Sequence, residues 1–546
     1  MRTASRVRPA IGAALCAALL LSPAATAAPS GATVYRSATA GTLAPSAPAA
    51  LAPQLTAPSH RSHGVRRVLP SPIAPASSIA PPAAAPTPLS LGPASLLANF
   101  NGVSSRDSAE VNFGGEFEPP DQGLCSGNGF VLEMVNSAYS VYDTAGKKLA
   151  GPFEVNGPFN EGLSEFSSDP RCYYDAAHNT WFATILTIDK EETGSALDIA
   201  VNTSGDPRTP WTAYKLNTTG LGGAGGPRER GCPCFGDQPT LGFDAHNIYV
   251  STNEFSIKGP QFDGAQIYAF AKKDLVALSS TVHYVHFAKL AIGGAPAASV
   301  QPALTTGSPA AEYFLGSIDP AEKLDQRIGV WALSEPALVA QGGIPTLSSL
   351  VLTSEAFGVP PKAEQKGAAS LIDTGDDRMQ QAQFTGGAVW GELTTALTIP
   401  GDPQLRSGAA WFQVRPHLAG NALGSASIVR QGYVAVSGNY VMYPALQATP
   451  SGNVAMVLSV SGRMLHPSAA YSLLAGGAGS FGPVTVAAPG TGVYDPEGER
   501  WGDYSYALLD PSLSSVWLAT EYVPPKSSQT LDGHGNWGTR VLQVSP

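Results

Sequence analysis

Residues 237–244 read Asp-Gln-Pro-Thr-Leu-Gly-Phe-Asp, and this stretch decides the fold because its pattern recurs along the chain. An acidic or amide residue opens it, proline or a small motif follows, and a short apolar or aromatic segment comes next. Residues 121–125, Asp-Gln-Gly-Leu-Cys, and residues 169–175, Asp-Pro-Arg-Cys-Tyr-Tyr-Asp, open in the same way. Short apolar segments bounded by turn residues are typical of β-strands. A recurring opening indicates one supersecondary unit that is used several times.

Two weaker copies of this opening begin at Gln301 and Asp377, and the last two copies begin at Met442 and Asp503. After each opening and a polar turn, the sequence predicts a second strand. The seven second strands are expected at Phe130–Asn136, Trp181–Leu186, Ile248–Asn253, Glu312–Ile318, Ala388–Leu393, Val454–Val460 and Val516–Tyr522. Units spaced by roughly 50 to 75 residues fit four-stranded blades with outer loops of variable length. We therefore predict an all-β chain folded as a single seven-bladed β-propeller. Six blades with one irregular insertion remain an alternative, because the copies at Gln301 and Asp377 are degenerate.

The predicted propeller domain spans residues 96–546. Phe100–Val103 would supply an outer strand to the last blade, whose own strands end near Trp537–Val544. Closure by the two ends of the chain removes the unpaired edge that an open ring of sheets would leave.

Composition supports many short strands and excludes some functions. Only 14% of the 546 residues are charged, and the chain holds 59 glycines and 47 prolines, which disfavours coiled coils and long helices. The net charge is −10. A nucleic-acid partner held by neutralised phosphates is therefore not expected.

The N-terminal region has two predicted parts that lie outside the propeller. Residues 1–27 combine three arginines, an apolar run over 11–21 and an Ala-Thr-Ala motif at 25–27, the parts of a secretory signal peptide. The apolar run is too short to span a bilayer. Residues 28–95 are dominated by Ala, Pro, Ser and Leu, so they are expected to form a disordered linker or propeptide. We expect a secreted, extracellular monomer without a membrane span.

Secretion makes disulfides the expected state of the four cysteines outside the signal peptide. Cys125 and Cys172 occupy early positions of the first two inner strands, so we predict a bridge between them. Cys232 and Cys234 would then pair with each other. A zinc site built from all four thiolates is the alternative.

The region from about Leu96 onward resembles a group of secreted bacterial sialidase-like β-propeller proteins. The segments that carry the resemblance include 119–121 (Pro-Pro-Asp), 168–170 (Ser-Asp-Pro), 232–239, 443–445 (Tyr-Pro-Ala) and 501–505 (Trp-Gly-Asp-Tyr-Ser). The resemblance implies the propeller fold. True sialidases also carry Asp-box turns of the form S-x-D-x-G-x-T-W, which this sequence lacks, so sialidase chemistry is not carried over.

The opening acids are the first candidates for chemistry, because inner strands of a propeller begin at the mouth of its channel. Asp169-Pro170 is similar to the catalytic Asp of several propeller glycosidases. Two carboxyl groups suit glycoside cleavage, since one protonates the leaving oxygen and the other acts as base or nucleophile. We expect the catalytic carboxylates among Asp169, Asp237 and Asp503. The alternative is that these side chains cap backbone N–H groups between blades.

Candidate ligand-binding residues lie around the same openings. Arg171 and Arg500 would orient substrate, and Asp121 would contact it. Trp501 and Tyr504 would offer a surface for sugar stacking, unless they pack between blades. No cofactor or metal is required, although the loop at 373–377 offers the oxygen ligands that Ca²⁺ takes.

These features predict a protein that binds or cleaves extracellular glycan at the channel mouth, as a glycoside hydrolase or a polysaccharide lyase if it is an enzyme. The alternative is a non-catalytic propeller that binds extracellular or cell-surface protein partners. An enzyme should show a few carboxyl groups with raised pKa values in a deep pocket. A binding module should show every opening Asp satisfied by backbone N–H groups.

Overall fold

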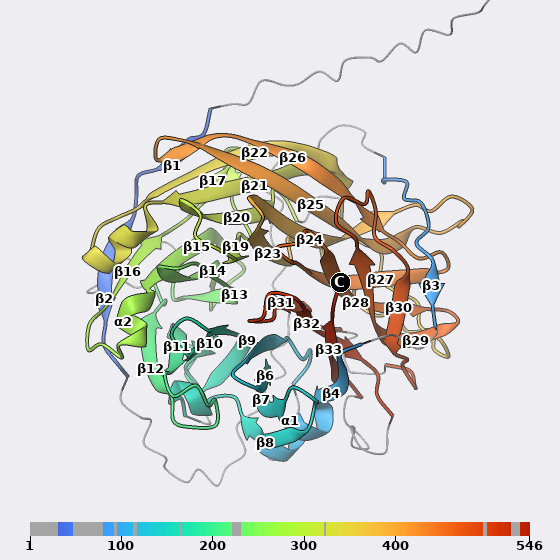
Figure 1. Cartoon of the computed structure of the whole chain (residues 1–546), viewed down its shortest axis with the longest axis horizontal. Coiled ribbons are helices and arrows are strands. Elements are labelled where there is room, and N and C mark those ends of the chain that lie inside the picture. The colour runs from blue at the N-terminus through green and yellow to red at the C-terminus, as the bar shows by residue number, and fades with distance from the viewer. Residues whose placement is uncertain are drawn as a thin grey trace, which may run out of the picture.

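The computed structural model describes residues 31–46, 80–91, 96–112, 117–162, 165–220, 231–320, 324–494, 500–525 and 536–546. Within these ranges the chain forms antiparallel meanders of four strands, which we number 1 to 7 in chain order. The meanders are arranged radially around a common centre (Figure 1). The predicted all-β architecture of repeated sheets is confirmed, and radial sheets of this kind are the architecture of a β-propeller.

The first three meanders lie between residues 123 and 287. Meander 1 contains β5 (Gly123–Gly127), β6 (Phe130–Val135), β7 (Ala138–Asp143) and β8 (Lys148–Glu154). Meander 2 contains β9 (Phe166–Asp175), β10 (Thr180–Ile188), β11 (Ser195–Asn202) and β12 (Thr212–Asn217). Meander 3 contains β13 (Cys234–Phe243), β14 (Asn247–Ser256), β15 (Phe262–Ala271) and β16 (Val282–Phe287).

The other four meanders complete the ring. Meander 4 contains β19 (Gln301–Thr305), β20 (Ala311–Ser317), β21 (Asp325–Ser334) and β22 (Thr346–Phe357). Meander 5 contains β23 (Gln381–Thr385), β24 (Ala388–Leu397), β25 (Arg406–Ala419) and β26 (Ala422–Val434). Meander 6 contains β27 (Asn439–Ala448), β28 (Val454–Gly462), β29 (Leu465–Leu474) and β30 (Val484–Ala488). Meander 7 contains β31 (Tyr506–Leu509), β32 (Val516–Tyr522), β33 (Gly538–Val544) and β4 (Ala98–Ser104).

Short elements connect the strands of the meanders. They are α1 (Ser105–Val111), α2 (Lys272–Val276), the 3-10 helices η1 (Gly157–Phe159) and η2 (Pro336–Gln341), β17 (Ala291–Ile292) and β18 (Ala295–Pro296). In the part of the chain that the structure describes, no helix has the length and apolarity needed to cross a membrane.

The second strand of each meander is buried along nearly its whole length, as in β10, β14, β24 and β28. Both faces of such a strand pack against neighbouring sheets, so its apolar residues do not alternate strictly with exposed polar ones. This explains why these strands are visible in the sequence. All seven predicted second strands coincide with β6, β10, β14, β20, β24, β28 and β32.

The predicted pairing of residues 100–103 with the last strand of the chain is confirmed. β4, from the N-terminal side, pairs antiparallel with β33 near the C-terminus, with Phe100 opposite Val541. Val103 N donates to Glu133 Oε2 at 2.7 Å, and Thr539 Oγ1 donates to Val103 O at 3.0 Å. The closing strand is thus fastened to meander 1 as well as to meander 7.

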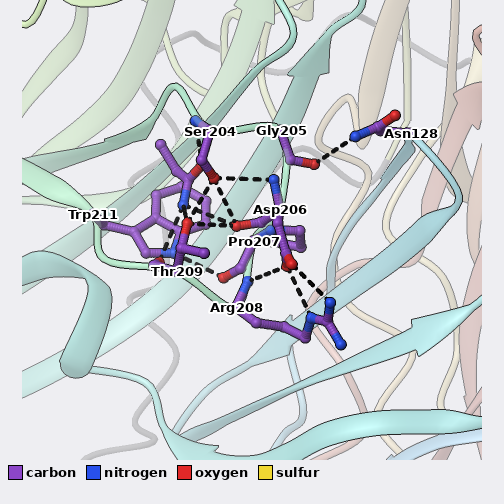
Figure 2. Close-up of polar contacts among 9 residues, drawn as sticks. Asn128, Ser204, Gly205, Asp206, Pro207, Arg208, Thr209 and Trp211 are labelled. Atoms are coloured by element: carbon purple, nitrogen blue, oxygen red, sulfur yellow. Dashed lines mark hydrogen bonds and ion pairs between the residues drawn. The ribbon is translucent and has the colours of Figure 1, made fainter.

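A polar loop between β11 and β12 ties meander 2 to meander 1 (Figure 2). Asn128 Nδ2 donates to Gly205 O at 3.0 Å. Arg208 holds the carboxylate of Asp206 through Nε and Nη2, at 2.9 and 2.7 Å. Gly205 has φ +77°, and a Cβ there would lie 2.3 Å from Asn179 Nδ2, so only glycine fits this turn.

The prediction that residues 28–95 are disordered is wrong for two stretches. Residues 31–46 and 80–91, which we call the strap, carry three short strands. β1 (Thr33–Tyr35) pairs with β22, β2 (Thr39–Leu43) pairs with β16, and β3 (Leu89–Ser90) pairs with β30. Threonine, valine and tyrosine favour strands, but the Ala and Pro around them dominate the composition of the region. The predicted signal peptide at 1–27 lies outside the described residues.

Candidate functional site

The repeated opening motif forms a bulge at the start of the inner strand. Asp169, Gln238 and Tyr443 have φ values of 57°, 49° and 47°, and each comes directly before proline. The strand register shifts beside each of them. Left-handed backbone is rare for residues other than glycine and costs about 1–3 kcal/mol.

A hydrogen bond from a neighbouring meander holds each bulge in place. Asp169 N donates to Asn136 Oδ1 at 2.7 Å, and Gln238 N donates to Asp169 Oδ2 at 3.2 Å. Tyr443 N donates to Thr394 Oγ1 at 3.1 Å. The motif that marks the repeat in the sequence is therefore a joint between meanders.

Asp121 is the most connected of the opening acids. Its Oδ1 accepts from Asp503 N and its Oδ2 accepts from Asn136 Nδ2, both at 2.7 Å. The side chain is buried in the seam between meanders 7 and 1. The expected capping of backbone N–H groups between blades is thus observed for Asp121 and Asp169.

Asp121 and Asp169 also form a hydrogen bond between their side chains. Burial raises the pKa of Asp121 to about 6, with a further contribution from the negative charge of Asp503. Burial raises the pKa of Asp169 well above its usual range, and the charges of Asp121 and Asp237 add to this shift. Two buried carboxyl groups in contact cannot both ionise at low cost, so this pair retains a proton near neutral pH.

Arg500 and Asp503 form an ion pair beside the acid pair. Arg500 Nη2 lies 2.5 Å from Asp503 Oδ2, and both side chains keep about a fifth of their surface exposed. Burial opposes the charge on Arg500, but the carboxylates of Asp503 and Asp121 outweigh it and raise the pKa of the guanidinium. Asp237 lies half-buried at the start of β13, on the other side of Asp169.

Arg171 lies flat on an aromatic ring in the same region. Its Cζ is 3.4 Å from the centroid of the Tyr504 ring and 5.3 Å from that of Tyr506. Arg171 is 2% exposed, yet its Nε and Nη2 have no hydrogen-bond partner in the described protein. Arg327 and Arg378 direct the same Nε and Nη2 edge at a carboxylate. The free edge therefore sets Arg171 apart from them.

Further polar groups without partners lie next to these residues in the sequence. Gln122, which follows Asp121, is fully buried, and neither its amide nitrogen nor its amide oxygen has a hydrogen-bond partner. The hydroxyl groups of Tyr504 and Tyr506 have none either within the described residues. Native proteins satisfy most buried polar groups, so unpartnered groups of this kind beside an acid pair mark a candidate functional site.

Trp501 does not lie where the sequence analysis expected it. The indole is 1% exposed, donates from Nε1 to Ser459 Oγ at 3.1 Å, and meets the Tyr494 ring edge-on at 4.7 Å. Its ring is surrounded by the apolar core rather than presented to a sugar. Tyr504 is also 1% exposed and stacks on Arg171, so neither aromatic ring offers an open face.

The two predicted disulfides are confirmed. Cys125 bonds to Cys172 and thereby links β5 to β9 close to Asp121 and Asp169. Cys232 bonds to Cys234. A zinc site of four thiolates is therefore wrong, because all four sulfurs are oxidised. Among the residues described, the one group of three metal-type ligands within reach of each other is Cys232, Cys234 and Asp263, so the acids of the 373–377 loop form no such group.

The sequence analysis missed four members of the site, and Gln122, described above, is one of them. Asn136 bridges Asp121 to the backbone of Asp169, and Gln238 accepts from Arg378 Nη1 at 2.5 Å. The ring of Tyr506 is the second aromatic ring beside the Arg171 guanidinium. Gln238 follows an opening Asp, and the repeat would have pointed to it. Asn136 ends a second strand and carries no comparable signal.

No family model matches this sequence, and no curated protein matches it. Solved structures give low-scoring matches. The hemagglutinin-neuraminidase ectodomain of parainfluenza virus 5 matches at 10% identity and a TM-score of 0.34, covering 70% of this chain and 82% of its own. The GH93 α-L-arabinofuranosidase of Fusarium graminearum matches at 10% identity and 0.34, covering 82% and 98%. An exo-β-1,3-galactanase from Clostridium thermocellum matches at 11% and 0.29, covering 82% and 96%. Scores and identities this low carry no information on the activity of this chain.

Proposed function

We propose that this chain is a seven-bladed β-propeller, exported by the signal peptide at residues 1–27, that binds and cleaves extracellular glycan at the cluster around Asp121 and Asp169. Each of the seven meanders is one blade, and the pairing of β4 with β33 supports this count because it completes the last blade. The two disulfides are consistent with export to an oxidising compartment.

One observation carries the proposal. Buried polar groups without hydrogen-bond partners surround a carboxyl pair that retains a proton near neutral pH. A protonated carboxyl group is what general-acid cleavage of a glycosidic bond requires. Arg171, Gln122 and Tyr504 offer donors and acceptors of the kind that hold sugar hydroxyl or carboxylate groups.

The partly exposed residues would meet the glycan first. Asp503 and Arg500 keep part of their surface accessible, whereas Asp121 and Asp169 lie beneath them. In this arrangement Asp503 acts as base or nucleophile and Asp169 supplies the proton, because burial and the nearby charge of Asp121 keep Asp169 protonated before the reaction. Arg171 and Arg500 orient the substrate.

A second candidate is a non-catalytic propeller that binds extracellular protein partners. The observation in its favour is that Asp121 and Asp169 accept hydrogen bonds from the backbone N–H groups of Asp503 and Gln238. Such bonds give both acids a structural role that needs no substrate.

The deciding experiment measures release of reducing ends from a panel of neutral and acidic polysaccharides by the purified full chain. We expect release that is lost by at least 100-fold in Asp169→Asn and in Asp503→Asn. Asp143→Asn is the matched control, because Asp143 caps an exposed turn and asparagine retains its acceptor.

Each result separates the candidates. Release that persists in both variants would place the chemistry elsewhere. Binding of a glycan without release, unchanged in Asp169→Asn, would favour a binding protein. Absence of both binding and release across the panel would favour the protein-partner function.

A further inference from the structure

The strap covers sheet edges that would otherwise be open. In meander 4, β22 pairs on its outer side with β1, with Thr33, Val34 and Tyr35 opposite Ser349, Ser348 and Leu347. In meander 3, β16 pairs on its outer side with β2 over the five residues from Thr39 to Leu43. An unpaired outer strand is a template for pairing with another chain, so each pairing removes a potential interaction site.

Tyr35 is the anchor of the strap. Its hydroxyl donates to Ala291 O at 2.6 Å, accepts from Trp331 Nε1 at 3.0 Å and lies 3.0 Å from Ser349 Oγ. The ring packs against the buried cluster that contains Trp331. A strap residue thereby completes the polar contacts of a fully buried tryptophan.

Gly41 shows that the edge of meander 3 fits this particular sequence. A Cβ on Gly41 would lie 2.6 Å from Cζ of the Tyr284 ring. Any other residue would have to displace this ring, which is itself mostly buried. Only glycine fits at the centre of β2 without displacing the Tyr284 ring.

The rest of the strap is held by backbone pairing and remains largely exposed. Thr33, Val34, Thr39, Ala40 and Thr42 are all exposed. Strand addition of this kind draws its affinity from main-chain hydrogen bonds and its specificity from a few side-chain pockets. Such a segment can dock equally well on an identical edge of another molecule.

The connection between the strap strands β1 and β2 and the rest of the chain is long enough for docking on another molecule. Residue 46 is held at meander 2, where Ser46 N donates to Ala213 O, and residue 84 is held at meander 5, where Ala84 N donates to Thr398 O. The stretch from 47 to 79 lies between them, and a chain of that length can span up to about 110 Å. This reach is several times the diameter of a small domain.

We propose that the outer edges of meanders 3 and 4 are a docking site for residues 33–43, and that two copies of this chain exchange these segments reciprocally, with residues 44–46 released from meander 2 together with them. Each exchanged strap makes in the partner the contacts that it makes in its own chain. Reciprocal exchange loses no pairing, so it competes with the monomer as the protein concentration approaches the effective concentration of the tethered strap, on the order of millimolar. The proposal is independent of the proposed glycan function.

The test uses two full-length copies with complementary cysteines. Thr42 and His283 are directly opposite in the β2–β16 pair, a spacing that suits a disulfide. One copy carries Thr42→Cys and the other carries His283→Cys. They are mixed, partly unfolded, refolded together at high concentration and oxidised, and covalent dimer is measured on a non-reducing gel. A single chain with both substitutions is the control for the strap register, and Thr42→Cys mixed with Glu191→Cys is the control for random collision.

We expect the double variant to crosslink internally as a monomer. The complementary mixture should give at least tenfold more covalent dimer than the mixture with Glu191→Cys, whose cysteine lies on an exposed surface away from the strap. Introducing Tyr35→Ala and Gly41→Val into the Thr42→Cys copy should reduce the dimer at least tenfold. Full internal crosslinking without the mixed dimer would overturn the exchange. Failure of the double variant to crosslink, or equal dimer with both partners, would overturn the docking site itself.

Discussion

Asp503 N donates to Asp121 Oδ1 at 2.7 Å, although 382 positions separate the two residues in the sequence. The bond crosses the seam where the last meander meets the first. Through Asn136 and Asp169, the same carboxyl group also reaches meander 2. One buried acid thus fastens three meanders, and the residue that closes the ring is also the partner of the candidate proton donor.

Asp121→Ala tests this fastening. The substitution leaves Asp503 N and Asn136 Nδ2 without their acceptor in a buried site, so we expect the free energy of unfolding to fall by about 3 kcal/mol. Asp121→Asn keeps one acceptor and should cost less than half of this. Urea denaturation measures both. Glu191→Ala, at an exposed site, should change stability by no more than about 0.5 kcal/mol, and a similar value for Asp121→Ala would rule out the role.

Glu133 makes the closure dependent on pH. Burial raises the pKa of Glu133 from 4.5 to about 7, partly offset by hydrogen bonds from Thr539 and Val103 N. The folded protein therefore holds a proton that the unfolded chain has released, so stability declines as pH rises from about 4.5 through 7, by about 3 kcal/mol. Glu133→Gln should make the measured decline smaller by about this amount, while other buried acids with raised pKa values, such as Glu154 and Asp198, keep their contributions. Urea midpoints at about pH 5 and about pH 8 give the comparison, and an unchanged decline would contradict the assignment.

The two disulfides should differ in their contribution to stability. Cys125 and Cys172 are 47 positions apart and Cys232 and Cys234 only 2, so the first bridge restricts the unfolded chain far more. We expect loss of about 4 kcal/mol in Cys125→Ala/Cys172→Ala and about 2 kcal/mol in Cys232→Ala/Cys234→Ala. Thermal unfolding of the two double variants should reproduce this order. The reverse order would show that native-state contacts, and not chain entropy, dominate.

Arg171→Met separates binding from folding. Methionine fills a similar volume beside Tyr504, and the Nε and Nη2 edge of Arg171 makes no hydrogen bonds to lose. We expect stability to stay within about 1 kcal/mol of the wild type or to rise, because a buried charge is removed. Affinity for a glycan that the wild type binds should fall at least 100-fold. Arg171→Lys retains the charge without the planar edge, and it should restore little binding. If Arg171→Met binds the glycan as tightly as the wild type, Arg171 is not part of the binding site.

Trp501→Phe should behave as a core substitution. It removes the hydrogen bond to Ser459 Oγ and part of the packing against Tyr494, with an expected cost of about 2 kcal/mol. Glycan affinity should remain within twofold of the wild type. Calorimetry of unfolding and of glycan binding on the same preparation distinguishes the two effects. A large loss of glycan affinity with unchanged stability would show that Trp501 contributes to glycan binding.

The repeat could be predicted because its buried strands differ in composition from the turns between them. Second strands such as β14 and β24 are buried on both faces, and each has a short apolar segment near its start, at 248–250 and 388–390, that stands out from the turn before it. Closure by β4 followed from a short apolar strand placed before the first repeat. The disulfide between Cys125 and Cys172 followed from equivalent positions in neighbouring units.

The strap and the acid pair were not predictable in the same way. β1 and β2 lie within a region whose composition is dominated by Ala and Pro, and their partners are more than 200 positions away. The sequence named Asp121 and Asp169 but gave no reason to pair them, because the hydrogen bond between them depends on how closely two meanders pack. Trp501 was misplaced for a similar reason, since an aromatic residue beside charged ones does not reveal whether its ring is covered.

The pairing of β4 with β33 has a consequence for biogenesis. Arg540 donates a hydrogen bond to Asn99 across 441 positions. β4, which is synthesised early, can therefore pair only after β33 has been synthesised. Closing so long a loop adds little to the equilibrium cost, which grows only with the logarithm of loop length, but contacts this distant in sequence slow the search for the native state. The ring therefore cannot finish folding before β33 has been synthesised and is free to pair with β4.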